Sequence, residues 1–405
     1  MIDFSGANFT KIIKLTKKVE FKSEYPIEKL SEVCTEILAG GDVPKEKFSK
    51  EMTEEYKIPI FTNGTNENAL YGYTNVARIN KDSLTISARG SIGFCEIRKA
   101  PFYPAIRLIV ATPNEEKILL EYLKISVSNS QIYSGGGIIK QLTVPMANNI
   151  EIPVPSIEEQ KKIIAEFRAV DDEIKLQEKI IFDSDGEIKE KFSEMFSGIE
   201  EKISLEKLFQ SIETGSRPQG GVSQYSDGIL SLGGEHINNF DGHLNLENKK
   251  FVPRNFFEEN ILGRIEKNNI LMCKDGALTG KIAIVRDELK DNFALANEHI
   301  FVMKNSDEVL QNYLFYYLFF EDGQQQIKNN ITGMAQGGIN RNNLKKILIP
   351  MPPKELQEKF AEYVLEVENK KITAQKKIDE MKLLRENLVK NIFGKVEGKK
   401  FFALK

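Results

Sequence analysis

The chain has 405 residues, of which 41% are hydrophobic and 28% charged, and a formal net charge of −3. These values are typical of a soluble globular protein, and no apolar run approaches the roughly 18 residues that a membrane-spanning helix needs. Three isolated cysteines argue against a disulfide framework or a thiolate metal cage. We therefore expect a cytoplasmic protein, with no membrane attachment, that is long enough to form two or three cores.

The first part of the chain divides into an extension and a globular segment. Residues 1–25 are rich in lysine and have no counterpart later in the sequence. Residues 26–155 mix predicted short strands and helices. Within this segment, Arg-Gly-Ser-Ile-Gly at 89–93 is typical of a glycine turn between two strands, with a basic residue at its mouth.

A long helix is predicted over 156–198. Ser156 and Glu159 have the spacing of an N-terminal capping box, and apolar side chains recur in steps of four and three, as at a coiled-coil seam. The predicted seam residues of this helix are Ile163, Phe167, Val170, Ile174, Ile181, Ile188 and Met195. We expect a kink or local fraying at Gly186, because glycine costs about 1 kcal/mol in a helix interior.

A second globular segment is predicted over 199–352. It contains a comparable strand, glycine turn and strand at 270–285, with Lys274 at the mouth of the turn. Residues 276–281 resemble a nucleotide-binding phosphate loop only superficially, because three residues instead of four separate the glycines and Ile282 replaces the required Ser or Thr. A second glycine-rich site follows in each segment, at 135–137 and 333–338.

The most informative feature of the sequence is a repeat at an offset of 197 residues. Ile-Pro-Val-Pro at 152–155 returns as Ile-Pro-Met-Pro at 349–352, and the same Glu-x-Gln spacing follows each copy. A second long helix is predicted over 353–394, ahead of a basic tail at 395–405. Its seam residues are Phe360, Val364, Val367, Ile378, Met381, Leu388 and Ile392. Two seams in one chain most simply bury each other as an antiparallel pair.

The predicted fold class is an α/β (α+β) tandem repeat, in which two globular domains are separated by two long antiparallel coiled-coil spacer helices. A repeat longer than solenoid periods indicates two copies of a whole domain-plus-helix unit. Residues 151–200 carry 7 basic and 14 acidic side chains, so much of the negative charge lies on the first long helix. The rest of the chain can still present a local basic surface.

No catalytic or metal-binding constellation is evident in the sequence. His236, His243 and His299 are the only histidines, and none has zinc-ligand spacing. No Asn-Pro-Pro-aromatic or Asp-Pro-Pro-aromatic motif is present to hold a base for amino methylation, and no glycine-rich strand-turn-helix offers a cofactor site. We expect no catalytic residue, metal or cofactor in this chain, which disfavours a stand-alone enzyme.

The order of domain, Pro-x-Pro exit and Glu-x-Gln helix, given twice, resembles the DNA-specificity subunit of Type I restriction-modification systems. The likeness covers nearly all of 26–394. Its most specific marks are 152–160 with 349–357, the turn at 89–93, and 333–343. The resemblance implies two target-recognition domains, at 26–155 and 199–352, each an α/β domain that reads one half of a bipartite asymmetric double-stranded DNA target. The first copy departs from the pattern at Gly186 and in its shorter glycine site.

The resemblance also implies partners for a role in phage defence. The two helices would set the gap between the half-sites and dock two DNA methyltransferase (modification) subunits, which bring S-adenosylmethionine. Restriction/translocase subunits that use ATP and Mg²⁺ would join for cleavage. Residues 1–25 would then cap the helices, contact a partner, or be the remnant of a fusion.

Arg, Lys, Asn and Gln read base edges, whereas Lys, Ser, Thr and backbone amides contact phosphates. The first-domain candidates for DNA contacts are Asn63, Thr65, Asn66, Tyr73, Arg78, Arg89, Ser91 and Lys140. The second-domain candidates are Arg217, Gln219, Gln224, Tyr225, His236, Asn238, Lys274, Lys281, Asn340 and Arg341. Arg89, Lys274 and Arg341 rank first, because they flank glycine turns in parallel places. Ordinary turn chemistry is the alternative for each candidate, and Asn63-Gly64 is a turn signal before anything else.

Two other functions fit parts of the sequence. A protein-interaction scaffold explains the helices and the missing catalytic groups, but not the paired basic glycine turns. DNA reading within a fused or non-Type I methyltransferase, or another phage-defence system, explains both. Co-purification with a methyltransferase, followed by methylome sequencing, separates these possibilities.

Overall fold

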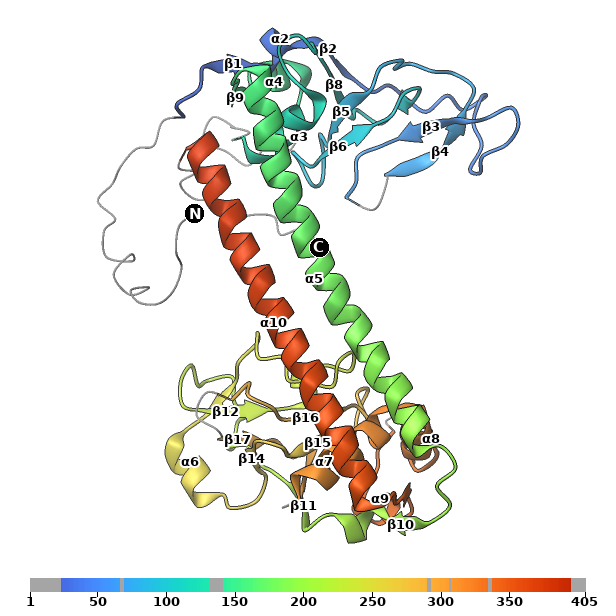
Figure 1. The fold of residues 1–405 in the computed structure, drawn as a ribbon, viewed down its shortest axis with the longest axis vertical. Helices are drawn as coiled ribbons and strands as arrows, with labels where there is room; N and C mark the ends of the chain where they lie inside the picture. Colours follow the sequence, from blue (N-terminus) through green and yellow to red (C-terminus); the bar gives the residue numbers. More distant parts are fainter. Residues whose placement is uncertain are drawn as a thin grey trace. The chain divides into compact units, whose positions relative to one another are not determined.

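The computed structural model of the chain describes residues 23–65, 69–130, 141–289, 293–305, 307–333 and 337–394. It divides into two compact units, of which unit 1 comprises 1–177 and 376–405 and unit 2 comprises 178–375. Each unit therefore holds one globular segment together with about half of each long helix (Figure 1). Within the described ranges, no helix is both long and apolar enough to cross a membrane.

The core of unit 1 is a four-stranded antiparallel sheet. Its strands, in order across the sheet, are β2 (Cys34–Ala39), β8 (Ile109–Pro113), β5 (Ser83–Ile86) and β6 (Cys95–Arg98). The two central strands, β8 and β5, are buried along their whole length. Helix α3 (Leu120–Asn129) packs on this sheet through Tyr122, Leu123 and Val127. The alternation of strands and glycine turns expected from the sequence is thus present.

A second, smaller sheet of unit 1 extends from this core. Its strands are β4 (Leu70–Thr74), β3 (Ile58–Phe61) and β7 (Tyr103–Pro104), and β3 pairs with β7 in parallel. Gly40 follows β2 where the chain passes the end of β7. A Cβ atom at Gly40 would lie only 2.7 Å from the backbone of Pro104, so close approach of two backbones requires glycine there.

Unit 2 repeats this architecture. Its main antiparallel sheet has the order β11 (Ser211–Thr214), β18 (Ile300–Lys304), β15 (Ile270–Cys273) and β16 (Ile282–Ile284). The second sheet has the order β13 (Phe251–Val252), β12 (Ile229–Leu232), β17 (Phe293–Ala296) and β14 (Arg264–Glu266). Here β12 pairs with β17 in parallel, as β3 does with β7 in unit 1. Strand β14 is the one addition to the second sheet.

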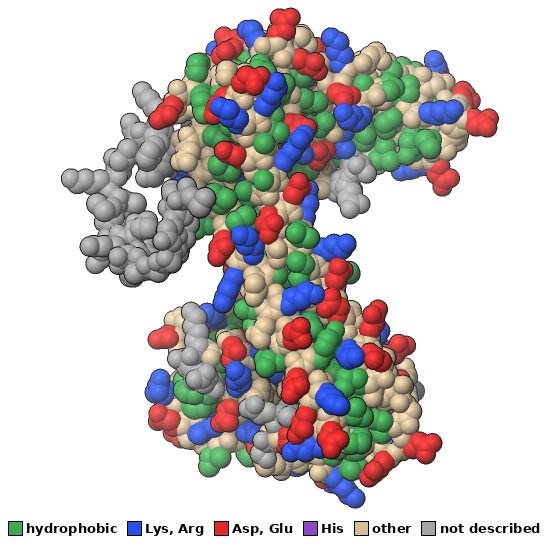
Figure 2. Space-filling model, in the orientation of Figure 1, with side chains coloured by type: hydrophobic (Ala, Val, Ile, Leu, Met, Phe, Trp, Pro, Cys, Tyr) green, Lys and Arg blue, Asp and Glu red, His purple; other side chains and the backbone are tan. Residues whose placement is uncertain are grey.

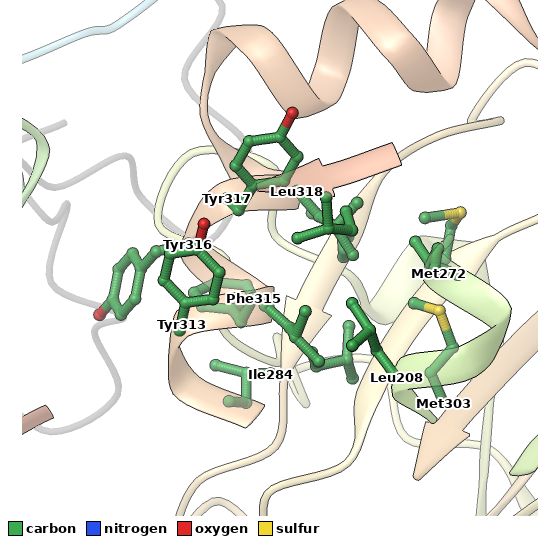
Figure 3. Packing of buried hydrophobic residues seen from close by; sticks show 14 of the residues in the cluster. Leu208, Met272, Ile284, Met303, Tyr313, Phe315, Tyr316, Tyr317 and Leu318 are labelled. Carbon is green, nitrogen blue, oxygen red and sulfur yellow. The ribbon is translucent and has the colours of Figure 1, made fainter. Parts of the chain in front are cut away.

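Helix α7 (Glu308–Phe319) supplies many of the aromatic side chains in the core of unit 2. It contributes Tyr313 and Phe315 to a cluster that also contains Met272 of β15, Ile284 of β16 and Met303 of β18 (Figure 3). Helix α8 (Glu321–Asn329) follows and adds the buried Ile327. These side chains are large and apolar, so their burial drives the sheet and helix together.

In each unit, a strand near the start of the globular segment pairs with the strand at its end. In unit 1, β1 (Ile27–Lys29) pairs antiparallel with β9 (Glu151–Pro153), and in unit 2, β10 (Lys202–Ser204) pairs with β19 (Leu348–Pro350). The hydroxyl of Tyr122 donates a hydrogen bond to the Pro153 carbonyl at 3.0 Å, and that of Tyr313 donates one to the Pro350 carbonyl at 2.6 Å. The repeated Pro-x-Pro motif is therefore a repeated exit structure.

The two long helices pair antiparallel in each unit. They are α5 (Ile157–Phe196) and α10 (Lys354–Phe393) (Figure 1). In unit 1, Arg385 of α10 bonds Asp171 of α5; in unit 2, Lys371 of α10 bonds Asp185 of α5. All predicted seam residues are buried or half-buried. The predicted tandem α/β fold with two long antiparallel helices is confirmed.

The prediction of local fraying at Gly186 is wrong. Helix α5 continues through this residue without a break. Ser184 and Ile188, on either side of Gly186, are buried at 0% and 2% exposure, and Asp185 is tied to Lys371. Tertiary packing of the flanking residues outweighs the weak helix propensity of one glycine.

The remaining described helices are short. They are α2 (Leu30–Val33), α4 (Val144–Asn148), η1 (Leu205–Leu208), η2 (Gly234–His236), α6 (Arg254–Glu259) and α9 (Arg341–Leu344).

Candidate nucleic-acid interface

The glycine turns predicted from the sequence have the same hydrogen bonding in both units. In unit 1 the Ser87 amide donates to Phe94 and the Gly93 amide donates back to Ser87, at 2.8 and 2.9 Å. In unit 2 the Cys273 amide donates to Lys281 and the Gly280 amide donates back to Cys273, at 2.9 and 2.8 Å. Gly93 and Gly280 have φ values of 88° and 86°, which are unfavourable for residues with a side chain.

Each turn lies against the segment that precedes the exit strand. The Leu142 amide donates to the Ala88 carbonyl at 2.8 Å, and the Ile339 amide donates to the Lys274 carbonyl at 2.7 Å. Leu142 and Ile339 are related by the 197-residue offset of the repeat. The repeat therefore builds the same two-segment surface in both units, although few of its side chains are the same.

This hydrogen bonding corrects the sequence alignment by one residue. Lys274 occupies the position of Ala88, and Asp275 occupies that of Arg89, so the two basic residues are not structural equivalents. Arg89 donates from Nη2 to Oε1 of Gln141 at 2.8 Å. Gln141 was not identified from the sequence, although the repeat offset aligns it with Gly338.

In unit 2 the same two segments border an open hollow of about 430 Å³. Its lining brings together three residues predicted to contact DNA, namely Lys274, Asn340 and Arg341. The other lining residues are Asp275, Phe301, Thr332, Gly338 and Ile339. Asn340 also caps α9, because its side-chain oxygen accepts a hydrogen bond from the Asn343 amide at 3.0 Å.

A polar network extends from this hollow to Arg217. The guanidinium Nε of Arg217 donates to both carboxylate oxygens of Glu298 at 2.9 Å, and its Nη2 lies 3.3 Å from Nε2 of His299. Nδ1 of His299 lies 2.5 Å from Oδ1 of Asp275. Partial burial acts to raise the pKa of Glu298, but the Arg217 hydrogen bond and backbone donors keep it below its usual range. Glu298 and Asp275 were not found by sequence reasoning, because acidic loop residues carry no distinctive signal.

Three predicted DNA contacts form hydrogen bonds within the protein. Asn63 accepts a hydrogen bond from the Ala88 amide and donates one to the Ile106 carbonyl, both at 2.6 Å. Asn238 donates to Asp241 and accepts from the Phe240 amide. His236 is 1% exposed, with Nδ1 accepting from the Gly233 amide and Nε2 against the Asn248 carbonyl. The prediction of His236 as a base contact therefore does not fit the structure.

The other predicted DNA contacts lie on exposed or half-buried loop and strand surfaces. In unit 1 these are Thr65, Tyr73, Arg78 and Ser91. In unit 2 they are Gln219, Gln224, Tyr225 and Lys281. The structure does not test whether any of them touches DNA. Asn66 and Lys140 lie outside the described residues, as do most of 1–25, the first glycine site at 135–137 and the tail at 395–405.

Acidic and basic side chains are interspersed on the face of the molecule seen in Figure 2. In the described ranges, no group of three or more His, Cys, Asp or Glu residues has the geometry of a metal site. Burial raises the pKa of the Cys95 thiol to about 12 and also raises that of Cys273.

Comparison with known proteins places this architecture in a family. The model of the Type I restriction modification DNA specificity domain matches residues 22–182 and again 241–382. The chain belongs to this family. The two matches correspond to the two copies that the structure shows as repeated sheets, turns and exits.

Individual specificity subunits align with part of the chain. A Mycoplasma pneumoniae protein named as a type I specificity subunit is 35% identical over 145 residues, which cover 36% of this chain and 43% of that protein. The Type I restriction enzyme MjaVIII specificity subunit of Methanocaldococcus jannaschii is 24% identical over 283 residues, covering 63% and 64%. The alignments with such relatives span 39% to 64% of their own lengths.

The fold is also that of a solved specificity subunit. The crystal structure of the Type-I restriction-modification system S subunit from M. genitalium matches with a TM-score of 0.55, at 14% identity, over 94% of this chain and 99% of that one. A structure from work on complex assembly and conformational transition of the type I R-M system matches equally well, at 15% identity over 93% of this chain.

Proposed function

We propose that this specificity-family chain is the non-catalytic DNA-reading subunit of a Type I restriction-modification complex. Unit 1 and unit 2 would each read one half of a bipartite, asymmetric double-stranded DNA target. One observation carries the proposal: the two units share strand order, turn geometry and exit, but differ in the residues at equivalent turn positions. Ala88 and Lys274, Arg89 and Asp275, and Gln141 and Gly338 are such pairs. A shared backbone structure that carries different polar side chains in each unit is suited to reading two different half-sites.

The paired helices are proposed to set the gap between the half-sites and to dock two methyltransferase subunits. A helix of 40 residues is about 60 Å long, well beyond the size needed to pack on one small domain. Large apolar side chains also stand exposed on both helices. Leu176 and Leu383 in unit 1 are 52% and 47% exposed, and Phe182 and Leu365 in unit 2 are 66% and 63% exposed. Exposed apolar residues on a helix pair favour a protein partner.

The chemistry is proposed to come from the partners. The methyltransferase subunits would supply S-adenosylmethionine, and restriction/translocase subunits would supply ATP- and Mg²⁺-dependent cleavage. This chain would hold none of these cofactors.

Methylome sequencing tests the proposal directly. The chain is co-expressed with its methyltransferase subunit in a host without other adenine methylation, and the complex is purified through the chain. We expect a 2:1 complex of methyltransferase to specificity subunit and a methylated motif made of two different half-sites around a fixed gap. A stable complex with no methylated motif would instead support a protein scaffold that reads no DNA.

Exchange of one domain provides the matched control. Replacing 26–150 with the corresponding segment of another family member should change one half-site and leave the other half-site and the gap intact. A change in both half-sites would contradict the assignment of one half-site to each unit.

A further inference from the structure

We propose that the hollow in unit 2, between the turn at 274–280 and the segment at 338–341, binds a single DNA phosphodiester group. Lys274 and Arg341 would be its cationic partners. The inference rests on the proposed function, because it takes unit 2 to face DNA. It goes further by giving this surface a positioning role, in which it holds the backbone and reads no base.

The charges at the hollow favour an anion. Among the described residues, neither the ammonium of Lys274 nor the guanidinium of Arg341 has a hydrogen-bonded or ion-paired carboxylate. The Lys274 ammonium lies 5.8 Å from the centre of the Phe301 ring, and Phe301 is only 5% exposed. The carboxylate in the lining, Asp275, is held by His299. The lining carries two cations and one carboxylate, so its net charge is positive and favours an anion.

The shape of the site favours a phosphate over a base edge. Base edges lie at the bottom of a major groove about 8.5 Å deep, so side chains that read them must stand out from the protein. Phosphates project from the ridges of the duplex. Lys274 is half-buried and, like Arg341, borders an open hollow of about 430 Å³. Arg341 is exposed at the hollow, whereas the half-buried Lys274 can receive a projecting phosphate but does not stand out far enough to enter a groove.

The equivalent position in unit 1 explains why the hollow exists. Gln141 stands there, and its amide oxygen accepts the hydrogen bond from Arg89. Its counterpart in unit 2 is Gly338, which has no side chain to fill the space. The backbone does not require glycine at 338, because a Cβ atom would lie 3.4 Å from the nearest atom, the carbonyl oxygen of Lys274, and φ is not positive. The missing side chain therefore makes room for a ligand.

The test uses the full chain in its complex with the methyltransferase subunits. Lys274→Gln and Arg341→Gln each remove one cation. Gly338→Gln keeps both cations and introduces at the hollow the side chain that stands at the equivalent position 141 of unit 1. Lys346→Gln removes a cation that is exposed next to α9 but does not line the hollow. Binding to target and non-target duplexes is measured by fluorescence anisotropy across a salt series, and the methylated motif is sequenced for each variant.

We expect each of the first two substitutions to weaken binding to both duplexes by the same factor, roughly tenfold. Each should also make the slope of log K against log salt shallower by about 0.9, the value for one phosphate contact. Gly338→Gln should weaken binding to both duplexes in the same way, Lys346→Gln should change neither quantity, and the methylated motif should stay the same in all four variants.

Two results would overturn the phosphate site. A changed base preference in one half-site would show that the hollow reads bases. Unchanged affinity and slope in all three hollow variants would show that it does not touch DNA. If the wild-type complex methylates no motif, the proposed function itself is contradicted. This outcome can be distinguished from a failure of the phosphate site alone.

Discussion

Arg385 donates a hydrogen bond from Nε to Oδ1 of Asp171 at 3.0 Å, and this contact joins α10 to α5 within unit 1. The same guanidinium lies 5.5 Å from the centre of the Phe167 ring, at the buried seam. Arg385 lies four residues after Met381 and three before Leu388, so it continues the four-and-three spacing of the predicted seam of α10. Its charge is thus matched by a carboxylate, and its planar group packs on an aromatic ring.

Removing the two partners should have unequal effects. Both side chains are about one-third exposed, so Asp171→Asn should lower the free energy of unfolding by only about 0.5–1 kcal/mol. Arg385→Ala should cost about 1–2 kcal/mol, because it also removes the packing on Phe167. Urea unfolding of both single variants and the double variant measures the coupling. Equal costs for the two single variants would contradict the role given to Phe167.

His243 should make the stability of unit 2 depend on pH. Its Nδ1 lies 3.2 Å from Glu288 and its Nε2 lies 3.7 Å from Glu368 of α10, which also faces Lys371. Burial acts to lower the pKa of His243, but the two carboxylates outweigh it and raise the pKa to about 9. A raised pKa stabilises the fold fully below the ordinary value near 6.5, and this contribution is lost as pH rises through about 9.

The free energy of unfolding should therefore fall between pH 6.5 and 9 by an amount on the order of 3 kcal/mol. His243→Gln should be less stable than the wild type at pH 6.5 and should lose most of this pH dependence. Urea titrations at several pH values measure both effects. A pH dependence that is the same in the variant would assign it to other groups.

The repeated Glu-x-Gln motif allows a comparison of two equivalent side chains. Gln160 is fully buried, donates to the Pro155 and Lys117 carbonyls at 2.9 Å and accepts from the Leu119 amide at 2.8 Å. Gln357 keeps the Pro352 contact at 2.9 Å. Gln160→Leu should cost about 3 kcal/mol, because it leaves several buried backbone groups unpaired, whereas Gln357→Leu should cost about 1 kcal/mol. Thermal unfolding checks this order, and the reverse order would contradict it.

Two glycines should respond oppositely to the same substitution. Gly186 lies in α5 with open space around it and no positive φ, so Gly186→Ala should stabilise the protein by about 0.5–1 kcal/mol. A Cβ atom at Gly215 would overlap the carbonyl of Ala296, so Gly215→Ala should cost roughly 4 kcal/mol or prevent folding of unit 2. Circular dichroism melts compare both variants. Destabilisation by Gly186→Ala would point to a functional need for glycine in α5.

Lengthening both helices tests their proposed role as a ruler. Four residues inserted after Gln177 of α5 and four after Gln375 of α10 add about 6 Å to each, close to two base-pair steps of 3.4 Å. The gap in the methylated motif should lengthen by about two base pairs while both half-sites stay the same. Insertion into α5 alone is the control, and it should break the pairing of the seams. Altered half-sites at a constant gap would refute the ruler.

The repeat, the two long helices and their apolar seams could be predicted from the amino-acid sequence alone. These features are visible in the sequence because apolar residues recur with helical periodicity and because the Pro-x-Pro and Glu-x-Gln spacings are local patterns. The sequence also marked the glycine turns, because positive φ at Gly93 and Gly280 leaves a local signature.

Which polar side chains share a surface could not be predicted and became clear from the three-dimensional structure. In the folded chain, Lys274 and Arg341 line the same hollow although 67 residues separate them. The hydrogen bonds of the turns show that Lys274 corresponds to Ala88 and not to Arg89. The structure also shows that His236 is buried and that α5 remains helical at Gly186. Such outcomes depend on long-range packing and hydrogen bonding between segments, which a local pattern of residues does not encode.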